Sequence, residues 1–299
     1  MFTSRFTSFL VVSFFASALW CLGIISIGAA EPAAPARASS DRAEEINRLI
    51  DQIHADVAAV RRETAARPKT TLDSGIAGSK NFTVLAPRGE HLAEEVLERA
   101  EALRKEIALL WLGEELSPGT ALTHITLWLD DKQDRGTTLL CGPGRAFRGD
   151  HRMWLTTSRE RALGSTLAHE ITHVVLAGRF PRGMPAWANE GIASMQDDAE
   201  RAEQRRELLS RFVREDRWPA LSSVLQLPAI SPDNQAAYAV SVSLTEHLLS
   251  RGSREQLLKF VEQGAARGWD AALRESYGLA DVDALEREWK TWVKAHIAP

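Results

Sequence analysis

Apolar residues recur every three to four positions in two long stretches of the first part of the chain. The first stretch covers residues 41–67 and stops before Pro68; its apolar positions are Ile46, Leu49, Ile50, Ile53, Val57 and Val60. The second covers residues 90–112 and stops before Gly113; its apolar positions are Leu92, Val96, Ala100, Leu103, Ile107 and Leu110. This period predicts two amphipathic helices. The first helix would either pack on the body of the protein or serve as a coiled-coil or prosegment element.

Three short segments are predicted to be strands: residues 81–86, 123–130 and 147–156. The second has the alternation of a half-buried strand, because Thr123, Ile125, Leu127 and Leu129 share one face. The sequence Cys141-Gly-Pro-Gly indicates a turn before the third strand. Residues 70–80 are expected to form a loop.

The pattern from residue 163 onward is mostly helical. Residues 163–178 carry an apolar surface and end at Gly178, and Pro185 suits the first position of a second helix over 185–195. Further helices are predicted over 201–214, over 235–250, after the capping sequence Ser253-x-x-Gln256, near residue 271 and over 281–296, with loop and short turns over 217–232. Strands followed by helices predict an α+β fold, with a small mixed β-sheet and a mostly helical C-terminal half.

The N-terminus has the pattern of a targeting segment. Arg5 is the only charged residue before Glu31, residues 9–27 are almost wholly apolar, and Gly28-Ala29-Ala30 offers small residues for cleavage. The apolar run is also long enough to span a bilayer, so residues 1–30 are a signal peptide or a membrane anchor. Both alternatives predict an exported protein, periplasmic or extracytoplasmic, with membrane attachment through residues 9–27 in the second case.

The domain organisation follows from these segments. After residues 1–30 come an Ala/Pro linker over 31–40, the N-terminal helix within 41–68, and a main domain over 80–299 that divides into 80–198 and 199–299. The formal net charge of −4 gives no electrostatic reason to expect a nucleic-acid partner. Cleavage of the targeting segment would leave Cys141 as the only cysteine, which excludes an internal disulfide.

The sequence His169-Glu170-x-x-His173 lies in the middle of the predicted helix 163–178. Helical residues turn by about 100° each, so the two histidines lie roughly 40° apart and about one turn along the axis. They can bind one zinc ion, and Glu170 can reach a water on that ion. A metzincin would have a third histidine six residues after His173, where this chain has Arg179. The motif alone is also compatible with a solvated or salt-bridged helix face.

The histidine motif together with Trp187-x-x-Glu190-Gly191-x-Ala193 resembles the peptidase MA-like group of gluzincins, the thermolysin-type zinc metallopeptidases. The resemblance is specific over residues 165–196. It implies a zincin-like metallopeptidase fold with Zn2+ bound by His169, His173 and Glu190, and with Glu170 as general base. Where thermolysin-like enzymes have an aspartate four residues after the ligand glutamate, this chain has Ser194, so the sequence does not identify the partner of the first histidine. The only close rivals of Glu190 as third ligand are Asp197 and Asp198.

The resemblance also implies a function, the zinc-dependent hydrolysis of peptide bonds in a peptide or protein substrate. The strand before the metal helix commonly forms the sheet edge in gluzincins, so residues 148–155 could pair with a substrate chain. Tyr238 is the candidate hydrogen-bond donor to the oxyanion, or else a structural tyrosine. His247 lies about 180° further round the same helix, and His151 is expected to be a surface residue rather than a fourth ligand.

Two other interpretations remain open at this point. One is a non-catalytic zinc-binding envelope protein of the same fold that acts as a binding or interaction module. The other is a metal-free, structural helical protein.

Overall fold

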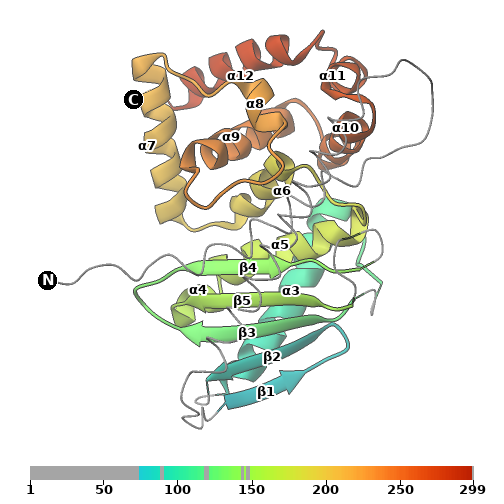
Figure 1. Cartoon of the computed structure of the whole chain (residues 1–299), viewed down its shortest axis with the longest axis vertical. Coiled ribbons are helices and arrows are strands. Elements are labelled where there is room, and N and C mark those ends of the chain that lie inside the picture. The colour runs from blue at the N-terminus through green and yellow to red at the C-terminus, as the bar shows by residue number, and fades with distance from the viewer. Residues whose placement is uncertain (1–73, 88–90, 118–120, 143–144, 146–148, 298–299) are drawn as a thin grey trace, which may run out of the picture. The chain divides into compact units, whose positions relative to one another are not determined.

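Five short strands form one mixed sheet in the order β1-β2-β3-β5-β4 (Figure 1). Their bounds are β1 Ser74–Gly78, β2 Phe82–Pro87, β3 Thr123–Leu129, β4 Arg135–Leu139 and β5 His151–Thr157. The three inner strands β2, β3 and β5 are parallel, whereas the outer strands β1 and β4 run antiparallel to their neighbours. The computed structural model describes residues 74–87, 91–117, 121–142, 145 and 149–297, all of which belong to one unit, Asp73–Pro299.

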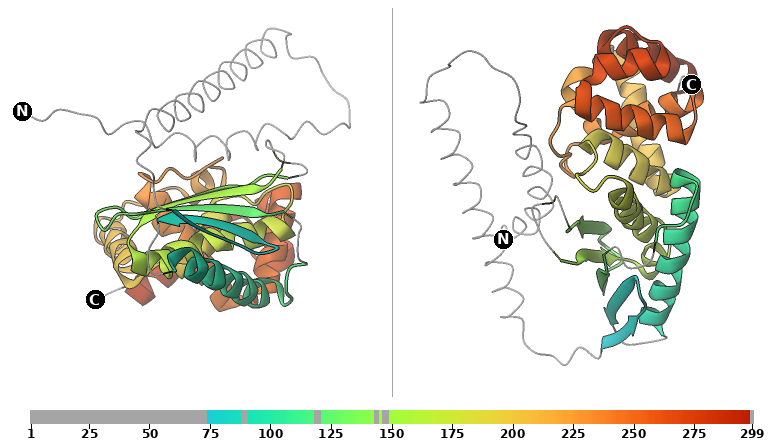
Figure 2. Two further views of the ribbon diagram at one scale, coloured as in Figure 1. Left: turned by 90° about the horizontal axis from the view of Figure 1, so that it is seen from below. Right: turned by 90° about the vertical axis from the view of Figure 1, so that its right-hand side faces the viewer.

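Two helices cover one face of this sheet (Figure 2, left). Helix α3, Leu92–Leu112, packs on β1 and β2, and helix α5, Ser165–Arg179, packs on β4 and β5. The short helix α4, Arg159–Ala162, leads into α5. The sheet face beneath the helices is made of buried apolar side chains, which include Phe82, Val84, Ile125, Leu127, Met153 and Leu155. Burial of this face fixes the register, because a slip of one residue would turn these side chains to the opposite face.

The rest of the described chain is helical. The helices are α6 Ala186–Ala193, η2 Ser194–Gln196, α7 Ala199–Glu215, α8 Leu221–Leu225, α9 Gln235–Arg251, α10 Arg254–Arg267, α11 Trp269–Tyr277 and α12 Val282–Ile297. Their core contains the fully buried rings of Trp187, Phe260 and Trp289. Helix α9 contacts α6, α7, α8, α10 and α12, and α6 also contacts α5. Helix α6 therefore connects the sheet-and-helix half to the helical half.

Most of the predicted elements are confirmed. The α+β class, the mixed sheet and the mostly helical C-terminal half agree with the prediction, as do the strands expected at 81–86 and 123–130. The expected N-cap is present, since the Ser253 side chain accepts a hydrogen bond from the backbone N–H of Gln256. Gly113 ends α3 in the left-handed region with φ 76°, which a residue without a Cβ adopts at little cost.

Two strands contradict the sequence-based prediction. The segment 70–80 was expected to be a loop but contains β1, and β4 was not predicted. Their sequences, Ser-Gly-Ile-Ala-Gly and Arg-Gly-Thr-Thr-Leu, contain glycine and lack alternating large apolar residues. They are strands because a neighbouring strand satisfies their backbone groups, which is a tertiary effect that local propensity does not report.

The strand before helix α5 does not lie at the sheet edge, so the expectation for residues 148–155 is wrong. Strand β5 pairs on one side with β3 and on the other with β4. Both of its edges are therefore occupied by backbone hydrogen bonds. The outermost strand on this side, within the described part of the chain, is β4, and its free edge is the one that an extended peptide could join.

The predictions for residues 1–30, 31–40 and 41–68 lie outside the described residues. Among the helices that the structure describes, none is long and apolar enough to cross a membrane.

Candidate metal centre

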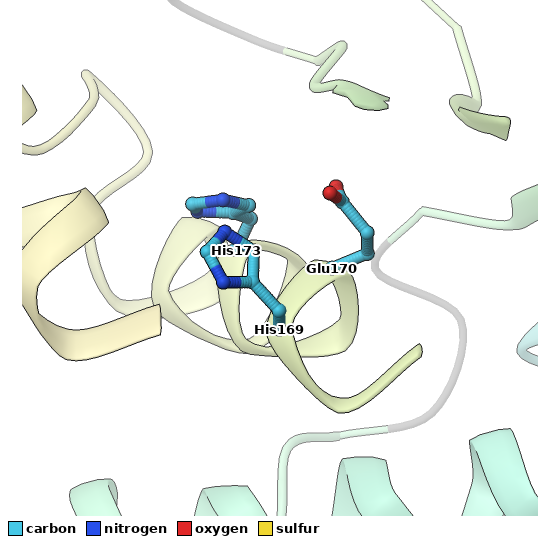
Figure 3. A group of neighbouring side chains, drawn as sticks. All are labelled: His169, Glu170 and His173. Atoms are coloured by element: carbon cyan, nitrogen blue, oxygen red, sulfur yellow. The ribbon is translucent and has the colours of Figure 1, made fainter. Parts of the chain in front are cut away.

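Helix α5 carries both histidines of the motif and is held in place by its apolar side. Leu167, Ile171 and Val175 are fully buried on that side. His169 and His173 lie one turn apart, and their ring centroids are 4.9 Å apart with the rings nearly perpendicular (Figure 3). The predicted helical spacing is thus confirmed, and the two imidazoles are close enough to share a ligand.

Helix α6 brings Glu190 to the same place. It follows α5 after a short loop, and Pro185 is its N-cap, one position before the expected first helical residue. Glu190 Oε2 lies 3.6 Å from His169 Nε2, and Glu190 Oε1 lies 3.8 Å from His173 Nε2. Gly191 lets α6 approach α9 closely, because a Cβ at this position would overlap the Ser241 carbonyl. The three side chains that the resemblance nominates as ligands therefore converge.

The distances from the two histidines to Glu190 can be compared with those in a tetrahedral zinc site. With zinc–nitrogen and zinc–oxygen bonds of about 2.0–2.2 Å, neighbouring ligand atoms of a tetrahedron lie about 3.4 Å apart. The Nε2–carboxylate distances of 3.6 and 3.8 Å are near this edge, and each ends on a different oxygen of Glu190. Two imidazoles and one carboxylate are also a ligand set that catalytic zinc sites use.

Glu170 is a second carboxylate near the two histidines. Within the described residues, His169, Glu170 and His173 form the one metal-capable group of histidine, cysteine and acidic side chains, with one ligand atom of each within 4.8 Å of the others. Glu170 accepts a hydrogen bond from Thr138 Oγ1 of β4, with the oxygens 2.6 Å apart. Glu190 is not part of this group, although each of its oxygens lies within 3.8 Å of one histidine Nε2.

Asp197 is the partner of the first histidine. Its Oδ1 lies 3.0 Å from His169 Nδ1, and its side chain is 3% exposed. Two guanidinium groups of α7 also contact this carboxylate, Arg205 at 2.7 Å and Arg201 at 3.3 Å. An Nδ1–H that donates to Asp197 leaves the Nε2 lone pair free to face Glu190 and a cation. Asp197 therefore contacts the Nδ1 side of His169, whereas Glu190 faces Nε2.

The charges around His169 favour a cation between the imidazole and Glu190. Burial lowers the pKa of His169, but hydrogen bonds to Asp197 and Glu190 outweigh it and raise the value to about 10. Burial raises the pKa of Asp197, whereas the hydrogen bond to His169 and the nearby arginines bring it down to about 2. The carboxylates on both sides of the imidazole therefore favour a positive charge at His169.

Tyr238 lies on α9 and contacts the centre through Glu190. Its hydroxyl lies near that carboxylate and interacts with it electrostatically. Burial and the Glu190 and Glu170 carboxylates raise the pKa of Tyr238 well above its usual value, so the phenol stays protonated.

The other two histidines singled out in the sequence lie away from this group. His151 is buried, against the expectation of a surface position, because β5 presents it on the helix-covered face; its Nδ1 accepts a hydrogen bond from Cys141 N–H. Burial lowers its pKa to about 4. His247 packs against the Trp292 ring on the side of α9 that faces α12, so it shares no site with Tyr238, as predicted.

A network of charged residues, not expected from the sequence, supports the centre. Asp134 accepts hydrogen bonds from Thr157 and Thr166 and pairs with Arg161 and Arg201. It thereby ties α4, α5 and α7 to the segment between β3 and β4. No motif marks these residues, because the network forms only when distant segments come together.

Comparison with known proteins finds no protein-family model that matches the chain and no curated protein that is significantly similar to it. The resemblance to gluzincins therefore depends on the motif residues and on their arrangement in space.

Proposed function

We propose that the protein is an exported zinc-dependent peptidase of the gluzincin type with a zincin-like fold, and that His169, His173 and Glu190 hold the zinc ion. One observation carries this proposal. The Nε2 atoms of two histidines one helical turn apart both face one carboxylate from a second helix, at 3.6 and 3.8 Å. A surface salt bridge would not need two imidazoles on the same carboxylate, nor a buried aspartate behind one of them.

The reaction follows from the groups around the centre. A bound zinc ion supplies Lewis acidity, which lowers the pKa of a coordinated water to about 7 and polarises a carbonyl group. Glu170 accepts a proton from the attacking water while the water oxygen bonds to the carbonyl carbon. Glu170 then gives the proton to the amide nitrogen as the carbon–nitrogen bond breaks. Tyr238 either steadies Glu190 or donates to the oxyanion.

The free edge of β4 is the proposed position of the substrate backbone. The inward-facing Thr138 of this strand contacts Glu170, so a peptide paired with β4 would lie beside the general base. Pairing through the backbone suits peptide and protein substrates of varied sequence. The proposal assigns the chain no nucleic-acid partner, in line with its net charge of −4.

Metal content and hydrolysis measured together test this function. We expect one zinc ion per purified chain and zinc-dependent cleavage of an unfolded protein or a peptide library. Glu190→Ala should lower the zinc content sharply. Glu170→Gln keeps size and shape, so it should keep zinc and lower the rate by roughly 10²–10⁴-fold.

The same measurement separates the alternatives. Stoichiometric zinc without cleavage of any library would favour the non-catalytic envelope protein. Absence of zinc after exposure to a stoichiometric amount would exclude both zinc proteins and leave the structural one.

The location is proposed from residues 1–30. Mass spectrometry of protein recovered from its cell should find a chain that begins near Glu31. A chain that keeps Met1 and partitions with membranes would identify residues 9–27 as an anchor and still keep the metal centre outside the cytoplasm.

A further inference from the structure

Two residues of β4 contact the Glu170 carboxylate. Thr138 Oγ1 donates a hydrogen bond to Glu170 Oε2 over 2.6 Å. Gly136, two positions earlier and so on the same face of the strand, lies against the other oxygen, because a Cβ at this position would overlap Glu170 Oε1. Strand β4 therefore contacts both carboxylate oxygens. Thr138 donates a hydrogen bond to Oε2, and Gly136, which has no Cβ, leaves room for Oε1.

The contact with Thr138 has the length of a strong hydrogen bond. Bonds from a hydroxyl to an ionised carboxylate are about 2.5–2.7 Å long and roughly twice as strong as neutral ones. Glu170 is 5% exposed, so water screens the contact little. Because the Glu170 side chain would otherwise rotate about its terminal bond, one strong hydrogen bond is enough to fix which oxygen points where.

We propose that Thr138 is a positioning residue for Glu170, a role that rests on the proposed peptidase function. Its hydroxyl holds Oε2, so that Oε1, in the space that Gly136 leaves open, is the oxygen that takes the proton from water. The same strand offers the free edge to the substrate. Strand β4 thus sets the position of the general base relative to the peptide bond that it helps to cleave.

Steady-state kinetics of three threonine variants tests this role. Thr138→Val keeps the shape and removes the donor, so kcat should fall about 10- to 100-fold while KM and zinc content stay unchanged. Thr138→Ser restores the hydroxyl and should recover most of kcat. Thr137→Val is the matched control. Thr137 is the next residue of β4 and donates to the Gly136 carbonyl, not to Glu170, so this variant should behave like the wild type.

Thermal unfolding of the metal-free protein gives a readout that does not depend on activity. Thr138→Val should lower the melting temperature clearly in the wild type, since it leaves a buried carboxylate without its donor. In a Glu170→Ala background the same change should lower it much less, because the partner is already missing. Equal decreases in the two backgrounds would overturn the proposed contact.

The outcomes separate this inference from the function on which it rests. An active wild type whose kcat is unchanged in Thr138→Val would overturn the inference alone. If kcat falls in Thr138→Val and Thr138→Ser does not restore it, the effect comes from packing and not from the hydroxyl. That result would also overturn the inference. A wild type without zinc-dependent hydrolysis would overturn the peptidase function, and the positioning role with it.

Discussion

Replacing Asp197 by asparagine changes the centre without touching a proposed ligand. The Asp197 carboxylate accepts from His169 at 3.0 Å, from Arg205 at 2.7 Å and from Arg201 at 3.3 Å. Asparagine has one oxygen for these donors. If that oxygen faces Arg205, the amide N–H points at His169 Nδ1 and favours the tautomer with its proton on Nε2, the nitrogen proposed to bind zinc. If the oxygen faces His169, the amide N–H meets a guanidinium group.

Either orientation loses a hydrogen bond to a charged group, which is worth about 1.5–3 kcal/mol. We therefore expect Asp197→Asn to bind zinc about 10- to 100-fold more weakly, which corresponds to about 1.4–2.7 kcal/mol. Competition for zinc with a coloured chelator at neutral pH measures this directly. The control is Asp198→Asn: Asp198 caps α7 through the backbone N–H of Arg201, so zinc affinity should not change. A folded Asp197→Asn protein with wild-type affinity would refute the reasoning.

Three further predictions concern stability and Tyr238. Burial, and then the nearby cations, lower the pKa of His247 to about 4 from the usual 6.5. The neutral His247 side chain therefore stabilises the folded protein fully above pH 6.5. This stabilisation is lost as the pH falls toward 4, at up to about 1.4 kcal/mol per pH unit. Urea unfolding of the metal-free protein measures the unfolding free energy at each pH. Between about pH 7 and pH 5 this free energy should fall less steeply for His247→Leu than for the wild type. Equal slopes in the two proteins would contradict the lowered pKa of His247. Gly191→Ala should lower the unfolding free energy by about 1–3 kcal/mol, because its methyl group would overlap the Ser241 carbonyl and the Thr245 hydroxyl. An unchanged denaturation midpoint would argue against the close α6–α9 contact. Tyr238→Phe removes the hydroxyl that interacts with Glu190 and should weaken zinc binding about five-fold. Unchanged zinc affinity with a rate about 10²-fold lower would assign the hydroxyl to the oxyanion instead.

The helices could be predicted from the sequence because their signals are local. The apolar stripe of α3, the pair of residues His169 and His173 on one face of α5, and the Ser253 cap each lie within one or a few helical turns. Such features depend on the 3.6-residue period and on backbone groups at helix ends, which neighbouring residues supply.

The parts that the sequence did not predict depend on distant segments. Strand β4 is stable as a strand through its pairing with β5, and its role as the outer strand follows from the sheet order. The sequence leaves Asp197 as a rival ligand, because its distance along the chain from Glu190 does not show which atom its carboxylate will contact. Thr138 lies in a segment for which no structure was predicted, 32 positions from the Glu170 side chain that it contacts.

The central claim is that His169, His173 and Glu190 bind one zinc ion. Crystals of the zinc-loaded protein, measured on both sides of the zinc absorption edge, locate the ion directly. We expect one anomalous peak per chain, about 2.0–2.2 Å from the Nε2 atoms of both histidines and from a Glu190 oxygen, with Glu170 outside the coordination sphere. A peak bound by Glu170 instead of Glu190, or no peak between α5 and α6, would contradict it.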